Sequence, residues 1–148
     1  MKFQLVSDIH LEFGHTVHIH NAGADVLVLA GDICMARAFK NPDRNISNLG
    51  YYHFFDEVCK NFRSVVYVLG NHEHYKGTFN DSVNLLKAAL ADYDNLHILD
   101  NEWVTKIKNN KDKPMTIVDS RCSRMLIKWE EFDDNVCLTS KTAWTPLK

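Results

Sequence analysis

Three short, largely apolar runs stand out in the first half of the chain, and each ends in polar side chains. The runs cover Phe3 to Val6, Val26 to Ala30 and Val65 to Leu69. Because these runs show little alternation with polar residues, both faces of each predicted strand should be buried. Strands of this kind are typical of parallel sheets that are covered by helices.

Two other stretches have the period of an amphipathic helix. Apolar residues recur there at the i, i+3, i+4 and i+7 spacing that places them on one helix face. Thr78 is the predicted N-cap of the second helix, with Asp81 at the third position near the positive end of the helix dipole. The first stripe consists of Phe55, Val58, Cys59 and Phe62, and the second of Phe79, Val83, Leu86, Leu90 and Tyr93.

Two further strands are predicted at Asn95 to Leu99 and at Glu102 to Ile107. Strands and helices therefore alternate over residues 1–105, in the order strand, helix, strand, helix, strand. This order is typical of a layered sheet of the α/β class.

Residues 106–148 are patterned more weakly, and we interpret them as a divergent tail behind the α/β part, residues 1–105. Met115 to Val118 is predicted to be a strand and Arg124 to Phe132 a helix. The last glycine is Gly77, so 71 residues follow without one. That is unusual for an α/β domain, whose tight turns often use glycine.

Composition narrows the class of protein further. The chain of 148 residues is 45% hydrophobic and 24% charged, with a net charge of -2, as expected for a globular domain. Residues 1–105 carry 8 basic and 13 acidic side chains, so nucleic-acid binding is disfavoured there. No signal peptide and no apolar run of the roughly 20 residues that span a bilayer is evident. Four cysteines without CxxC spacing favour free thiols and a cytoplasmic location.

The polar ends of the three apolar runs carry side chains that bind metals. Asp8 and His10 follow the first run two residues apart, Asp32 follows the second, and Asn71 and His72 follow the third. Ligands of open parallel sheets bind beyond the carboxyl ends of the strands, so these side chains should meet at one edge. Carboxylate, imidazole and amide oxygen together suit Mn²⁺, Fe²⁺ or Zn²⁺.

These blocks resemble the signature of the metallophosphoesterases, the calcineurin-like phosphoesterase family, of the phage and bacterial type. The blocks are Asp8-Ile9-His10, Gly31-Asp32 and Gly70-Asn71-His72-Glu73. The resemblance covers about residues 1–105. It implies an α/β/β/α sandwich of which the N-terminal βαβαβ part is present, and metal-dependent hydrolysis of phosphate esters.

The resemblance also implies roles for individual residues. Asp8 and His10 would bind the first of two divalent metal ions, Asp32 would bridge both ions, and Asn71 would bind the second. His72 would stabilise the transition state or protonate the leaving oxygen, and Glu73 would orient it.

The family pattern continues with further histidines, among them a G-H-x-H motif, that this chain lacks. No histidine follows His97 and no glycine follows Gly77. We therefore expect a truncated domain in which metal occupancy is partial and activity is impaired. The origin of the tail stays open between a natural shortening, a deletion or frameshift, and a site that a second chain completes.

Two alternatives to a phosphoesterase remain at this point. The first is a non-catalytic binding or interaction protein derived from such an enzyme, and the second, weaker one is a nuclease. For the enzyme, the expected partner is a phosphate-ester substrate, either a phosphomonoester or a phosphodiester. No membrane partner is expected.

Overall fold

A computed structural model describes residues 1–40 and 49–100, and the backbone of five strands in the remainder of the chain. The chain forms two compact units. One consists of Lys2–Ile98, and the other of Leu99–Lys148 together with Met1.

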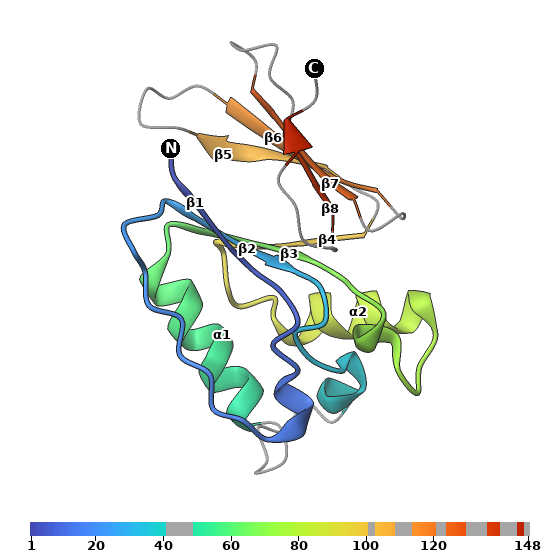
Figure 1. Ribbon diagram of the computed structural model, residues 1–148. Coiled ribbons are helices and arrows are strands. Elements are labelled where there is room, and N and C mark those ends of the chain that lie inside the picture. The colour runs from blue at the N-terminus through green and yellow to red at the C-terminus, as the bar shows by residue number, and fades with distance from the viewer. Residues whose placement is uncertain are drawn as a thin grey trace. The chain divides into compact units, whose positions relative to one another are not determined.

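The first unit is built on a four-stranded sheet with the strand order β1-β2-β3-β4 (Figure 1). β1, β2 and β3 are parallel, and their register pairs Leu5 with Val28 and Val28 with Val66. The sheet agrees with the α/β class predicted from the apolar runs. The strands are β1 (Phe3–Val6), β2 (Val26–Ala30), β3 (Ser64–Val68) and β4 (Leu96–Leu99).

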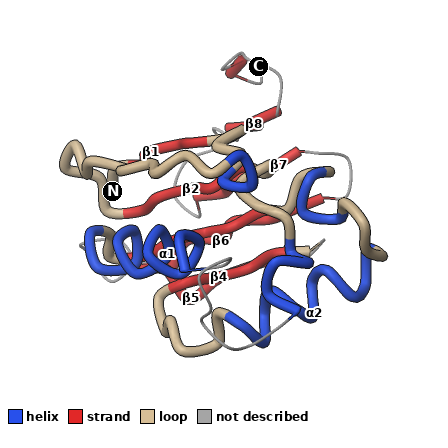
Figure 2. Tube along the Cα trace, turned by 90° about the horizontal axis from the view of Figure 1, so that it is seen from below, coloured by secondary structure: helices blue, strands red, loops and turns tan. Residues whose placement is uncertain are grey.

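Both predicted helices are present, as α1 (Leu49–Asn61) and α2 (Phe79–Ala89). Figures 1 and 2 show them on the same side of the four-stranded sheet. The Thr78 cap is confirmed, because its side chain accepts a hydrogen bond of 3.2 Å from the backbone N–H of Asp81. In the described part of the chain, no helix is long and apolar enough to span a membrane.

Phe79, the first residue of the stripe predicted for α2, is not buried. Its side chain is 72% exposed, whereas Val83, Leu86 and Leu90 are buried. Because α2 begins at Phe79, this residue lies at the outer end of the stripe, where its ring contacts the His74 ring at a tilt of 46°, with centroids 4.3 Å apart.

The core of this unit follows from the two central strands, which are buried on both faces as predicted. The same prediction for β1 is wrong, because β1 lies at the edge of the sheet and Leu5 is 40% exposed. Alternate residues of β2 and β3 pack with α1, namely Leu27, Leu29, Val65 and Tyr67. The residues between them are also fully or almost fully buried, so neither face of these strands is left to solvent. A rigid pair of strands therefore carries the loops that follow them.

The second unit contains a five-stranded antiparallel sheet with the order β5-β6-β7-β8-β9. The predicted strand Met115 to Val118 is confirmed within β6, but the predicted helix at Arg124 to Phe132 is wrong over residues 124–129, which form β7. Pairing explains the difference, because β7 forms ladders on both sides and Ile127 lies opposite Ile117 and Val136. Residues 130–132 lie outside the described residues. The strands are β5 (Trp103–Lys108), β6 (Pro114–Ser120), β7 (Arg124–Trp129), β8 (Val136–Thr139) and β9 (Thr145–Pro146).

Candidate metal centre

The loops that follow β1 and β2 are held in an unusual backbone conformation. Asp8, His10 and Asp32 have φ angles of 56°, 52° and 55°, in the left-handed region that side-chain-bearing residues seldom adopt. Hydrogen bonds between the two loops hold them there: the N–H of Asp8 donates to Gly31 O at 3.1 Å and that of His10 to Asp32 O at 3.0 Å. Such conformations cluster at functional sites, where the surrounding structure fixes them.

Two glycines allow the loops after β2 and β3 to approach each other. Gly31 has a φ of 87°, and a Cβ added to it would lie 2.9 Å from Gly70 Cα. A Cβ on Gly70 would lie 2.6 Å from the backbone nitrogen of Asp32 and would also collide with its carboxylate. The glycines of the G-D and G-N-H-E blocks are therefore needed so that the two loops can share one edge of the sheet.

Three of the predicted metal ligands come together at this edge. One donor atom each from Asp8, His10 and Asp32 lies within 4.8 Å of the others. Asp32 is tied to the third loop as well, since its Oδ1 accepts a hydrogen bond of 2.9 Å from the N–H of His72. Asn71, the fourth predicted ligand, is exposed at the start of η3 (His72–His74), directly before that N–H.

Glu73 is fully buried, and its carboxylate fastens the loop after β2 to the loop after β3. Oε2 accepts from the N–H groups of Asp32 at 3.1 Å and Gly70 at 2.7 Å. Oε1 accepts from the N–H of Ile33 and the hydroxyl of Tyr67, both at 2.7 Å. Glu73 thus positions the backbone of Asp32, and in the described residues it makes no hydrogen bond with the His72 ring.

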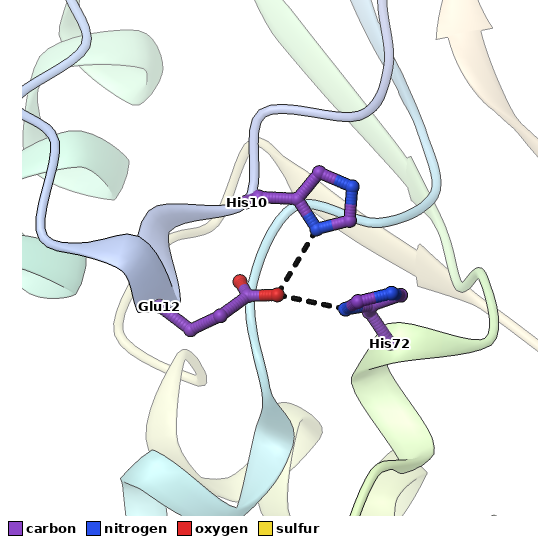
Figure 3. Close-up of side chains that lie close together, drawn as sticks. All are labelled: His10, Glu12 and His72. Carbon is purple, nitrogen blue, oxygen red and sulfur yellow. Dashed lines mark hydrogen bonds and ion pairs between the residues drawn. The ribbon is translucent and has the colours of Figure 1, made fainter.

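The carboxylate that does contact the His72 ring is Glu12, which the sequence analysis did not assign (Figure 3). Glu12 lies in η1 (Leu11–Phe13), and its Oε1 is 3.0 Å from His10 Nδ1 and 2.8 Å from His72 Nδ1. The two imidazole rings meet edge to face, with centroids 4.3 Å apart and an angle of 77° between their planes. One carboxylate oxygen therefore orients both a predicted metal ligand and a predicted catalytic residue.

A pattern in the sequence does point to Glu12 once the site is known. Asp8, His10 and Glu12 alternate with the apolar residues Ile9 and Leu11. Their convergence depends on the left-handed turns at Asp8 and His10, however, and an extended segment would not bring Glu12 to His72.

Charge and burial shape the ionisation of this cluster. The hydrogen bond to Glu12 raises the pKa of His10 above its ordinary value of 6.5, burial lowers it, and the charges of Glu12, Asp32 and Asp8 add to the rise. Burial tends to raise the pKa of Glu12, but hydrogen bonds from His10, from its own backbone and from His72 lower it overall. An ionised Glu12 therefore accepts from both imidazoles.

The residues present fit a divalent cation. Asp8, His10 and Asp32 supply the oxygen and imidazole donors that such ions take. The Glu12 side chain is only 5% exposed, and its Oε2 has no hydrogen-bond partner among the described residues, so a buried negative charge here lacks full compensation. Glu12, His10 and His72 form a second group whose donor atoms lie within 4.8 Å.

Comparison with known proteins places this chain in a family. Residues 1–140 match the family model described as calcineurin-like phosphoesterase, so the chain belongs to the calcineurin-like phosphoesterases. The match continues past residue 105, where the motifs recognised in the sequence end. The family is described as phosphoesterases, and the donor groups of this chain fit the divalent metal ions that the family implies.

One solved structure shows a weaker likeness, the phosphopantetheinyl hydrolase PptH from Mycobacterium tuberculosis. The two chains share 17% sequence identity with a TM-score of 0.49. The likeness covers 82% of this chain and 42% of that one, so this chain spans less than half of that protein's length. No curated protein matches the sequence significantly.

Proposed function

We propose that this chain catalyses metal-dependent hydrolysis of phosphate esters at the edge formed by the loops after β1, β2 and β3. The observation that carries the proposal is the convergence of Asp8, His10 and Asp32 within 4.8 Å on strained, mutually hydrogen-bonded loops. An edge of this kind, beyond the carboxyl ends of parallel strands, is where such folds bind their ligands.

Asp8, His10 and Asp32 would hold the first ion, and Asp32 with Asn71 a second one. A bound divalent ion neutralises phosphate oxygens and lowers the pKa of a coordinated water, which allows hydrolysis near neutral pH. The second position has weaker anchors among the described residues, because Asn71 offers only a neutral amide oxygen. We therefore expect partial occupancy, slow turnover, and Mn²⁺ as a suitable ion for the mixed oxygen and imidazole set.

His72 is the residue that would act on the leaving group. Its Nδ1 is engaged by Glu12, so its Nε2 is the ring atom left to donate a proton to the departing ester oxygen. Glu12 would hold the His10 ring in the same way, which leaves His10 Nε2 for the metal. Histidine ligands commonly donate their other ring N–H to a carboxylate, and losing that partner typically lowers metal affinity or activity 10–100-fold.

The test is hydrolysis of a chromogenic aryl phosphate with added Mn²⁺, by the intact chain and by Asp32→Asn. We expect slow turnover that a chelator abolishes and that Asp32→Asn loses. Asp92→Asn, which neutralises an exposed aspartate before β4, is the matched control and should keep full activity. Equal background rates for all three proteins would favour a non-catalytic binding protein instead.

A further inference from the structure

A cavity of about 480 Å³ lies among η2 (Ala36–Lys40), the segment after η3, and α2. Among the described residues that line it, three are basic, Arg37, Lys40 and Lys76, and one is acidic, Asp81. These four side chains together have a formal charge of +2. The cavity is therefore suited to an anion.

This concentration of positive charge stands out in an acidic part of the chain. Residues 1–105 contain only 8 basic side chains against 13 acidic ones, and three of those 8 line this cavity. Like charges repel one another, so an arrangement of this kind is relieved when an anion binds between them.

The backbone at the cavity is fixed in a way that resembles the metal loops. Lys76 has a φ of 58°, again in the left-handed region that a lysine seldom adopts. The guanidinium of Arg37 donates a hydrogen bond of 3.3 Å from Nη1 to the carbonyl oxygen of Lys76. Arg37 thereby joins η2 to the segment after η3 and places two of the cationic residues together.

Both segments lead directly from the metal centre. Lys76 follows His72 by four residues, so their Cα atoms are at most about 14 Å apart, and Arg37 follows Asp32 by five, at most about 18 Å. The ring of Tyr75, next to Lys76, lies 4.2 Å from the His72 ring. A substrate of nucleotide size is long enough to reach from one place to the other.

We propose that this cavity is a subsite for a second anionic group of the substrate, a phosphate or carboxylate carried on the alcohol part of the ester. The proposal rests on the proposed function, because the scissile phosphate occupies the metal centre and leaves the cavity to another group. Arg37 suits this role, since a guanidinium binds phosphate or carboxylate oxygens in pairs. The preferred substrates are then esters with two separated anionic groups.

A binding experiment tests the subsite without any turnover. The intact chain, in the presence of a chelator, is titrated with adenosine 3′,5′-bisphosphate while backbone amide NMR signals are followed. We expect saturable shifts at Lys76, Gly77 and Ser82. Lys76→Met and Lys40→Met should each weaken binding roughly tenfold, as loss of one charge-assisted hydrogen bond does. Lys2→Met, at the exposed start of the chain, removes the same charge elsewhere and should change nothing.

Absence of saturable shifts at the cavity, or equal affinity in Lys76→Met and Lys2→Met, would overturn the subsite. Inorganic phosphate serves as the second probe. Should it bind the cavity as tightly as the bisphosphate does, the cavity takes a free anion, and the assignment to the substrate is wrong.

Kinetics then separate the subsite from the proposed function. With Mn²⁺ present, Lys76→Met should raise KM for the bisphosphate roughly tenfold while KM for adenosine 5′-monophosphate and both kcat values stay the same. Binding at the cavity without hydrolysis of either compound would remove the proposed catalysis but leave the anion site standing. Hydrolysis of both compounds with no selective change in KM in Lys76→Met would support the proposed catalysis and overturn the subsite.

Discussion

Replacing Glu73 with glutamine should destabilise the unit of Lys2–Ile98 strongly, although the two side chains have the same shape. The carboxylate accepts four hydrogen bonds of 2.7–3.1 Å, two on each oxygen, and Oε1 accepts a fifth of 3.4 Å from the N–H of Cys34. In Glu73→Gln one oxygen becomes an NH₂ group, which donates and cannot accept. If the amide oxygen stays with Ile33 and Tyr67, the NH₂ group faces the N–H groups of Asp32 and Gly70.

Two partly buried donors then lose their acceptor. Each such loss costs about 1–3 kcal/mol, so the free energy of unfolding should fall by about 4 kcal/mol. A domain is typically stable by only 5–15 kcal/mol, so this change should leave the unit marginally folded. The loops after β2 and β3 would also separate, since Glu73 joins them, and metal affinity should decline with stability.

Amide hydrogen exchange in β2 and β3 is the suitable assay, because it reports on this unit by itself. All three tryptophans follow residue 100, so tryptophan fluorescence would not report on it directly. Glu57→Gln is the control: Glu57 pairs with the exposed ring of His18 at 2.7 Å, and a surface pair contributes about 1 kcal/mol at most. A loss below about 1 kcal/mol in Glu73→Gln would refute the account of Glu73 as the shared hydrogen-bond acceptor that joins the loops.

Three further outcomes follow from the site and the core. Glu12→Gln should keep the fold yet lower Mn²⁺ affinity and kcat 10–100-fold, measured by calorimetry and aryl phosphate hydrolysis; unchanged values would remove Glu12 from the site. Gly70→Ala should destabilise the unit by roughly 2 kcal/mol or more in hydrogen exchange, because its Cβ would meet Asp32, whereas Gly50→Ala, with open space around it, should not. In the Cys122→Ser/Cys137→Ser variant, the remaining thiols should react with a thiol reagent at pH 8 only after unfolding. Cys34 is buried and Cys59 is partly buried, and this burial raises the pKa of both thiols, that of Cys59 to about 12. Fast labelling of the folded protein would contradict these raised pKa values.

The first unit was predictable because its signals are local. The apolar runs of β2 and β3 lie within one residue of the observed strands, and the i, i+3, i+4 stripe marks the second half of α1. Thr78 was recognised as a cap because its partner, the N–H of Asp81, is only three residues away. The same holds for Gly31, whose place before Asp32 marks a turn.

The features that the sequence did not reveal depend on contacts between distant residues. Glu73 bonds to backbone groups about 40 residues away, and Glu12 meets a ring 60 residues away. No spacing in the sequence encodes either partner. β7 was wrongly predicted as a helix for a related reason. Its short apolar run fits a helix or a strand equally well, and only pairing with β6 and β8 determines that it is a strand.

The central claim is that Asp8, His10 and Asp32 together bind a divalent metal ion. Anomalous diffraction at the manganese edge from crystals soaked in Mn²⁺ tests it most directly. The account predicts a peak within bonding distance of one donor atom of each of these three residues, and its loss in Asp32→Asn. A peak confined to His10, Glu12 and His72, or no peak at this edge of the sheet, would contradict it.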